Sequence, residues 1–285
     1  MWYIVCIADR LPRGTPRGAI SGRPDSREAH MSVTVPRLIL LCGLIGLSGF
    51  VDSIAGGGGL ISLPAYFIAG FPPHMATGTN KLSAFMGCSV ATFNYARSGF
   101  IPWKTAAFSI AASLVGSMLG ARISLMIGDF WFRLILMIVI PVVAYYVFRK
   151  KDGAMEREPY PELKTMLLCV PISFFVGMYD GFYGPGAGMF LILLYTGIAH
   201  LPLDKANGIA KAVNLASNVG SLIVFLTNGT TVVRIGLMAG ACAMIGNYLG
   251  STLFKRDGSR IVRPVMLVVL TIFFVKMIAE MVGGA

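Results

Sequence analysis

Charged side chains are scarce in this sequence and are absent from several long runs. Asp, Glu, Lys and Arg make up 13% of the 285 residues, whereas soluble domains carry about 25%. None of them occurs within residues 53–80, 181–203, 212–233 or 235–254. A helix on the surface of a soluble protein needs a polar face, and a bilayer span needs about 20 mainly apolar residues. The runs therefore exclude an ordinary soluble domain and predict several membrane-spanning helices.

Clusters of metal-binding or disulfide-forming residues are also missing from the sequence. The five cysteines contain no CxxC pair, and there are only three histidines. These residues indicate neither a disulfide framework nor a zinc site. We therefore expect no metal and no cofactor, and we expect the cysteines within apolar runs to be buried and unreactive.

The excess of positive charge does not indicate a nucleic-acid-binding protein. The sequence has 24 Lys and Arg against 13 Asp and Glu, a formal net charge of +11. These basic residues lie in the N-terminal segment and in short connections between apolar runs, where membrane proteins place them. We expect the lipid bilayer, and no nucleic acid, as a partner.

The chain divides into four segments. Residues 1–35 are basic and rich in Gly and Pro, and we expect them to be disordered. Met31 directly precedes the first apolar run and is a candidate for the native start. A first transmembrane repeat is expected over residues 36–149, a polar linker over 150–164 and a second transmembrane repeat over 165–285.

An internal repeat relates the two transmembrane segments. A shift of 130 residues places Lys81 on Lys211, and a shift of 128 residues places Asp52 on Asp180. The matches concentrate on glycines and charged residues, which the general composition of membrane spans would not produce. Duplicated halves with glycine-broken segments at corresponding positions are typical of secondary transporters.

The pattern of apolar runs predicts an all-α protein. In each repeat the second run is too short to cross a bilayer alone, and we expect it to form part of a broken or re-entrant, Gly-rich helix. The predicted fold is a polytopic transmembrane helical bundle of two homologous repeats, with about eight to ten membrane segments. Helices are expected near residues 37–53, 58–70, 78–98, 103–126, 131–149, 165–182, 187–199, 206–227, 231–254 and 261–282.

Two pairs of small residues predict close helix packing. Gly116 and Gly120 form a GxxxG pair, and Gly246 and Gly250 form its counterpart in the second repeat. Such pairs allow the backbones of two membrane helices to approach closely.

The glycine-rich stretches are the first candidate part of a binding site. Four consecutive glycines cost a helix about 1 kcal/mol each relative to Ala. An unwound backbone inside a membrane is tolerated only where it is buried in protein or lines a cavity. A helix that starts after such a break presents free N–H groups and a positive dipole end to an anion; close helix packing is the alternative. The candidate anion-binding residues here are Gly56, Gly57, Gly58, Gly59, Gly184 and Gly186.

A lysine near the start of an otherwise apolar helix is the second feature, and it occurs once in each repeat. Hydroxyl and amide groups beside it can donate hydrogen bonds to an oxyanion. A lysine within a membrane segment indicates function by default, although it can also extend toward the lipid headgroups. The candidate substrate-binding residues are Thr77, Thr79, Asn80, Lys81, Asn207, Lys211 and Asn214.

Asp52 and Asp180 each lie between an apolar helix and a glycine break. One role for them is to carry a proton or cation and so couple transport to a gradient. The alternative is structural, with each carboxylate capping the next helix or pairing with Lys81 or Lys211. The sequence leaves both open.

The sequence resembles the TauE/SafE family of sulfite exporters, also called the toluene-sulfonate uptake permease family. The resemblance rests on the stretch DSIAGGGGLISLP at residues 52–64, on Pro72-Pro73, on ATGTNKL at 76–82 and on their counterparts in the second repeat. It covers residues 37–282. The second repeat departs from the polyglycine pattern, with Pro185 and Ala187 interrupting GPGAG. The resemblance implies a bacterial cytoplasmic-membrane transporter, driven by protons, for sulfite, a sulfonate or a related organosulfur anion.

We therefore expect a multi-pass secondary transporter without enzymatic activity, whose partner is a small anionic substrate. An anion channel, a transporter of a non-sulfur organic anion and a membrane-embedded enzyme are the alternatives. An enzyme would need a nucleophile–base pair or a metal cluster, and the sequence indicates neither. Assembly as a homo-oligomer stays open.

Overall fold

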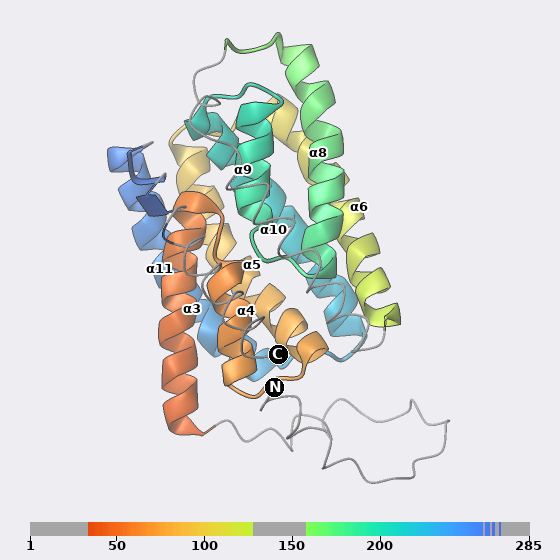
Figure 1. Ribbon diagram of the computed structural model, residues 1–285, viewed down its shortest axis with the longest axis vertical. Helices are drawn as coiled ribbons and strands as arrows, with labels where there is room; N and C mark the ends of the chain where they lie inside the picture. Colours follow the sequence, from red (N-terminus) through yellow and green to blue (C-terminus); the bar gives the residue numbers. More distant parts are fainter. Residues whose placement is uncertain (1–33, 128–157, 259, 263, 266–267, 269–285) are drawn as a thin grey trace, which may run out of the picture.

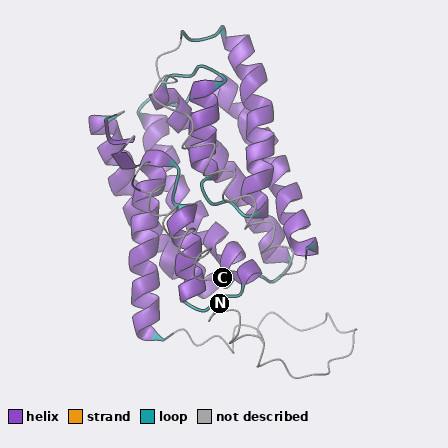
Figure 2. Ribbon diagram, in the orientation of Figure 1, coloured by secondary structure: helices purple, strands orange, loops and turns teal. Residues whose placement is uncertain are grey.

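A computed structural model describes residues 34–127 and 158–258, together with 260–262, 264–265 and 268, and the regular elements of these residues are helices (Figure 1; Figure 2). The predicted all-α class is therefore confirmed. Residues 1–33, the helix expected near 131–149, most of the linker 150–164 and most of the helix expected near 261–282 lie outside the described residues.

The described helices follow the same order of lengths in both predicted repeats, although a duplication itself stays a prediction. Each set has a long helix, a short helix and two further long helices. The first set is α3 (Val35–Ala55), α4 (Gly59–Ile68), α5 (Pro73–Arg97) and α6 (Trp103–Met126), and the second is α8 (Glu162–Phe182), α9 (Ala187–Gly197), α10 (Leu203–Thr227) and α11 (Val233–Asp257).

Proline residues determine where four of the long helices begin. Pro72, Pro102, Pro161 and Pro202 are the N-cap residues of α5, α6, α8 and α10. Proline has no N–H to donate into a preceding turn, and its fixed φ suits the start of a helix. The starts expected near residues 78 and 206 were wrong, because both helices already begin directly after their prolines.

Five of the described helices, α3, α6, α8, α10 and α11, are long and apolar enough to cross a membrane. Helix α5 is also 25 residues long, but its first half carries polar side chains that are buried inside the protein. The short helices α4 and α9 have 10 and 11 residues. At 1.5 Å per residue each is about half as long as the hydrocarbon core is thick. The expectation that these two elements cannot cross alone is confirmed.

The helices pack as two groups that exchange their last members (Figure 1). Helices α3, α4 and α5 pack with α11, and we call these the first helix group. Helices α8, α9 and α10 pack with α6, and we call these the second helix group. The main contact between the groups joins α5 to α10. The fourth helix of each predicted repeat therefore packs against the other repeat.

The two GxxxG pairs lie where α6 meets α8 and where α11 meets α3. A Cβ atom on Gly120 would lie 1.9 Å from the carbonyl oxygen of Met178, and a Cβ atom on Gly246 would lie 1.9 Å from that of Gly46. Only glycine fits at this separation. The predicted role in close helix packing is confirmed.

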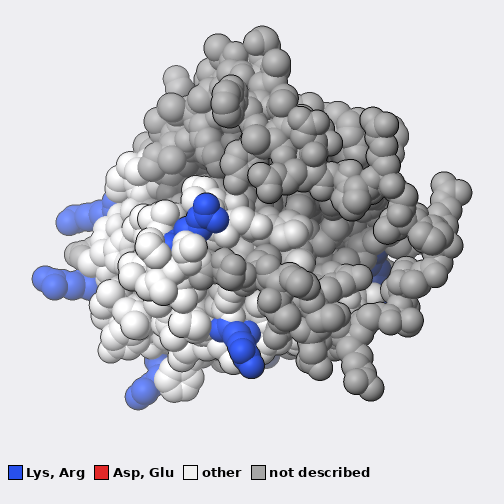
Figure 3. Space-filling model, turned by 90° about the horizontal axis from the view of Figure 1, so that it is seen from below, with Lys and Arg blue, Asp and Glu red and all other residues white. Residues whose placement is uncertain are grey.

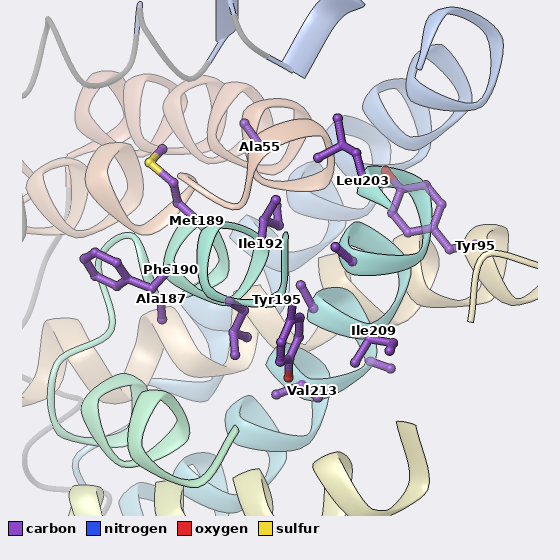
Figure 4. Packing of buried hydrophobic residues seen from close by; sticks show 14 of the residues in the cluster. Ala55, Tyr95, Ala187, Met189, Phe190, Ile192, Tyr195, Leu203, Ile209 and Val213 are labelled. Atoms are coloured by element: carbon purple, nitrogen blue, oxygen red, sulfur yellow. The ribbon is translucent and has the colours of Figure 1, made fainter. Parts of the chain in front are cut away.

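The largest apolar cluster surrounds the short helix α9. Figure 4 shows side chains of α9, including Ile192 and Tyr195, packed toward Ile209 and Val213 of α10. The Tyr195 hydroxyl lies 2.7 Å from the Ser173 Oγ atom, so the buried phenol keeps a polar partner. Helix α9 is thus enclosed by protein, which is the condition for a half-length helix inside a membrane.

Basic side chains stand at one end of the bundle. Seen from below, the described surface shows Lys and Arg side chains around its edge and no Asp or Glu (Figure 3). Lys and Arg gather where membrane helices reach water. This end of the bundle therefore has the composition of a membrane–water boundary.

Candidate functional site

The two glycine breaks pack directly against each other. Helix α3 ends at Gly56, whose φ of 72° lies in the left-handed region and whose N–H donates to the Asp52 carbonyl at 2.8 Å. The Gly56 carbonyl then accepts a hydrogen bond from the N–H of Met189 at 3.1 Å. A Cβ atom on Gly56 would lie 2.2 Å from the carbonyl carbon of Gly188. The break between α3 and α4 and the start of α9 therefore touch through backbone atoms.

Two buried ion pairs lie beside this contact, and each joins residues of both predicted repeats. The Lys81 Nζ atom lies 2.9 Å from Asp180 Oδ2, and the Lys211 Nζ atom lies 2.6 Å from Asp52 Oδ2. The lysine side chains are 2% and 1% exposed. Breaking a buried pair typically costs about 3–5 kcal/mol, because one charge stays buried without a partner. These lysines do not reach the headgroups, so the alternative of interface anchors is wrong.

Each carboxylate has further donors. Asp52 Oδ1 accepts a hydrogen bond from the Gly58 N–H at 3.3 Å, and its Oδ2 accepts one from the Cys88 thiol at 3.5 Å. Asp180 Oδ2 accepts a hydrogen bond from the Ser217 hydroxyl. The pairing considered for Asp52 is therefore observed, and its second oxygen accepts from the N–H of the residue directly before α4. A carrier role for the two carboxylates is not tested by these contacts.

A cavity of about 50 Å³ lies between the ion pairs and the glycine breaks. By this measure one water molecule needs about 10–15 Å³, so the cavity has room for a few waters or one small ion. Both aspartates line it, whereas among the described residues Lys81 is the one lysine in its wall. Its polar lining also comprises Ser48, Gly56, Gly58, Gly59, Ser62, Asn80, Ser83, Cys88, Gly184, Gly188, Asn214, Asn218 and Asn247.

Two amide side chains in the cavity wall have donor capacity to spare. Asn80 is 7% exposed, and its side chain has no hydrogen-bond partner among the described residues. Asn214 is also 7% exposed, and its Oδ1 accepts from Asn218 Nδ2 at 3.2 Å. That leaves the Asn214 Nδ2 group without a protein acceptor in the described part of the chain. Buried amides normally have partners, so these two are suited to a bound ligand.

Several of the residues expected in the site have other partners. Thr77 Oγ1 donates to the Pro73 carbonyl at 2.9 Å, and Thr79 Oγ1 accepts from the Val232 N–H at 3.0 Å. Asn207 Nδ2 donates to the Ile54 carbonyl at 3.2 Å. Thr79 and Asn207 connect helices, whereas Thr77 bonds within α5. None of the three lines the cavity, and neither do Gly57, Gly186 and Lys211.

Several cavity residues were missing from the expected site, among them Ser48, Cys88 and Asn247. Ser48 precedes Asp52 by four residues, and Cys88 follows Lys81 by seven, so both lie on the same helical face as a charged residue. This spacing was available in the sequence. Asn247 comes from α11, which reaches the site by packing on α3, and no local pattern predicts that.

Metal coordination is not indicated by the geometry. The described residues contain no group of three or more His, Cys, Asp or Glu side chains that could hold a metal ion. The charged and amide groups that line the cavity are the ammonium group of Lys81, the two carboxylates and the asparagine side chains.

The chain matches the family model "Sulfite exporter TauE/SafE" over residues 39–277. It is 34% identical to "Probable membrane transporter protein ORF9" of Sinorhizobium sp, over 82% of this chain and 89% of that protein. It is 31% identical to a "Probable membrane transporter protein" of Haemophilus influenzae, over 88% and 98% of the two chains. With the Escherichia coli K12 protein named "Probable membrane transporter protein YfcA" it shares 32% identity, over 83% and 88%. No solved structure matches the chain significantly.

The family match covers most of the chain, including both glycine breaks and both ion pairs. The resemblance drawn from the glycine and lysine motifs is confirmed. This protein belongs to the sulfite exporter TauE/SafE family of membrane transporters.

Proposed function

We propose that this protein is a secondary transporter that moves a small anion, such as sulfite or a sulfonate, across the bacterial cytoplasmic membrane together with a proton. One observation carries the proposal: a small cavity holds a buried lysine, two carboxylates and amide N–H groups without acceptors among the described residues. Ammonium and amide N–H groups are the donors that an oxyanion accepts from. The bacterial relatives named as membrane transporters support the location, and they support a function without enzymatic chemistry.

The charges at the site explain why an anion should travel with a proton. Two lysines balance two carboxylates when no anion is bound. An anion that enters this buried site adds a negative charge, which is costly in a medium of low dielectric constant. A proton taken up by Asp52 or Asp180 removes one negative charge and frees the paired lysine for the anion. One monoanion and one proton together leave the net charge unchanged.

The experiment that tests the proposal is flux of sulfite and of methanesulfonate into proteoliposomes, with and without an imposed pH gradient. We expect saturable flux that the pH gradient accelerates. A membrane potential alone should have little effect, because methanesulfonate and hydrogen sulfite are monoanions and each moves no net charge together with one proton. A channel would instead give flux that follows the potential without any pH gradient, and that result would contradict the proposal.

A lysine variant links the flux to the cavity. Lys81→Ala should abolish most of the flux, whereas Lys104→Ala is the matched control because its side chain is 83% exposed at the start of α6. Both variants must be compared at equal amounts of reconstituted protein. Equal flux in the two variants would exclude the cavity as the transport site.

A further inference from the structure

The two ion pairs differ in how they meet the cavity. Both members of the Lys81–Asp180 pair line the cavity wall. Of the second pair, Asp52 lines it and Lys211, which is 1% exposed, does not. An anion in the cavity can therefore approach the ammonium group of Lys81, while the carboxylate of Asp52 separates it from Lys211.

The amides with free donor groups line the same cavity as Lys81. Asn80 directly precedes Lys81 and lines the same cavity, without a hydrogen-bond partner among the described residues. Asn214 lines it from α10 with a free Nδ2 group in the same described set. At the shift of 130 residues that relates the predicted repeats, these positions correspond to Ala210 and Ala84, which have no donor. These donors therefore share the cavity wall with Lys81, whereas Lys211 does not line it.

The second pair has the contacts of a structural element. Asp52 holds Lys211 at 2.6 Å and also accepts from the Gly58 N–H and the Cys88 thiol. Its own carbonyl accepts the N–H of Gly56. Asp52 thus joins Lys211 to the glycine break, and releasing it would disturb several contacts at once. Asp180 has only the Ser217 hydroxyl in addition to Lys81 in the described structure.

From these differences we propose that the two halves of the site are not equivalent. Lys81, Asn80 and Asn214 bind the transported anion, and Asp180 is the carboxylate that leaves Lys81 when the anion arrives. Lys211 and Asp52 stay paired throughout and hold the glycine break in place. Ser217 retains its hydrogen bond to Asp180 after the exchange. This inference rests on the proposed function and assigns its binding step to one lysine.

Two charge-neutral double variants test the assignment without leaving a buried charge unpaired. One is Lys81→Gln with Asp180→Asn, and the other is Lys211→Gln with Asp52→Asn. The measurement is the thermal unfolding midpoint of the purified protein in detergent, titrated with sulfite, methanesulfonate, sulfate and acetate. The shift of the midpoint with anion concentration gives the apparent affinity, since a ligand that binds only the folded state stabilises it.

The first double variant should unfold near the parental midpoint without anion and lose the anion-induced shift. The second should unfold at a lower midpoint and still show a concentration-dependent shift. Loss of the shift in both variants, or in the second alone, would overturn the inference. If no anion shifts the parental protein and none is transported, the proposed function itself fails, which separates the two failures.

An amide variant gives an independent measurement. Asn80→Ala removes no protein–protein hydrogen bond of the described structure, so its midpoint without anion should equal that of the parent. Its anion affinity should fall by roughly tenfold or more, the effect of one hydrogen bond to a charged group. Asn207→Ala is the matched control, because that amide binds the backbone carbonyls of Ser53 and Ile54 and does not line the cavity. It should lower the midpoint and keep the parental affinity. A parental anion affinity in Asn80→Ala together with a reduced affinity in Asn207→Ala would show that the anion binds outside this cavity.

Discussion

Replacement of Gly56 by alanine tests whether contact between the two glycine breaks holds the site together. The φ of this residue is 72°, and an added Cβ would lie 2.2 Å from the Gly188 carbonyl carbon and 2.4 Å from the Met189 nitrogen. A left-handed conformation costs an L-residue about 1–2 kcal/mol. Overpacking adds typically about 1–3 kcal/mol. We therefore expect Gly56→Ala to lower the free energy of unfolding by about 2–5 kcal/mol.

Gly99→Ala separates the two contributions. Its φ of 73° matches that of Gly56, and no atom lies within 4 Å of the added Cβ. This variant should lose only the conformational part, about 1–2 kcal/mol, and should keep parental flux per folded molecule. Denaturant unfolding in detergent measures the loss of stability, and proteoliposome flux measures function. Because Gly56 also lines the cavity, flux in Gly56→Ala should fall further than the amount of folded protein does. Equal losses in both variants would show that the close contact between the breaks has no energetic weight.

Three further predictions concern packing and pairing. Asp52→Asn alone should lower the free energy of unfolding by about 3–5 kcal/mol, because it leaves Lys211 buried without a counter-charge. The double variant with Lys211→Gln should regain much of this free energy in the same unfolding assay. Gly120→Ala should reduce expression and thermal stability, since its Cβ would lie 1.9 Å from a backbone carbonyl of α8. Gly43→Ala on α3 is the control, because no atom lies within 4 Å of its added Cβ, and it should not reduce either quantity. Tyr195→Phe removes a buried hydrogen bond to a serine and should cost about 1 kcal/mol of unfolding free energy, while flux stays parental because the residue does not line the cavity.

Composition and local pattern were sufficient to predict much of the fold. Long uncharged runs without a polar face must be surrounded by lipid or protein, and a helix of about 20 residues pairs its own backbone groups there. The short lengths of α4 and α9 follow from the glycine breaks before them and the turns after them. The GxxxG pair of α6 predicts that this helix packs closely against another helix. It does not predict that the partner is α8, because the pair carries no information about the partner helix.

The site was predicted in its residue types and only partly in its contacts. The sequence shows polar side chains within apolar runs, and this contrast predicts a buried polar site. The residues found in this way are Asn80, Lys81, Asn214 and the two aspartates. Which aspartate pairs with which lysine depends on α10 lying beside α5 and on the exchange of α6 and α11 between the helix groups. The hydroxyls of Thr77 and Thr79 look identical in sequence to those of a binding site, but nearby backbone groups satisfy them first.

Under the proposed function, the position of the ion pairs would tie anion binding to motion between the two helix groups. Asp52 lies on α3 and Lys211 on α10, and Lys81 lies on α5 and Asp180 on α8, so both pairs cross from the first helix group to the second. An anion that replaces the Asp180 carboxylate at Lys81 removes one of the two ionic links between the groups and leaves the other. The groups could then shift about the remaining link, as expected for a transporter that alternates access by rocking two bundles. Such a motion requires one ion pair that opens and one that stays closed. The cavity lining fits this requirement, because both members of the Lys81–Asp180 pair line the cavity, whereas Lys211 of the other pair does not.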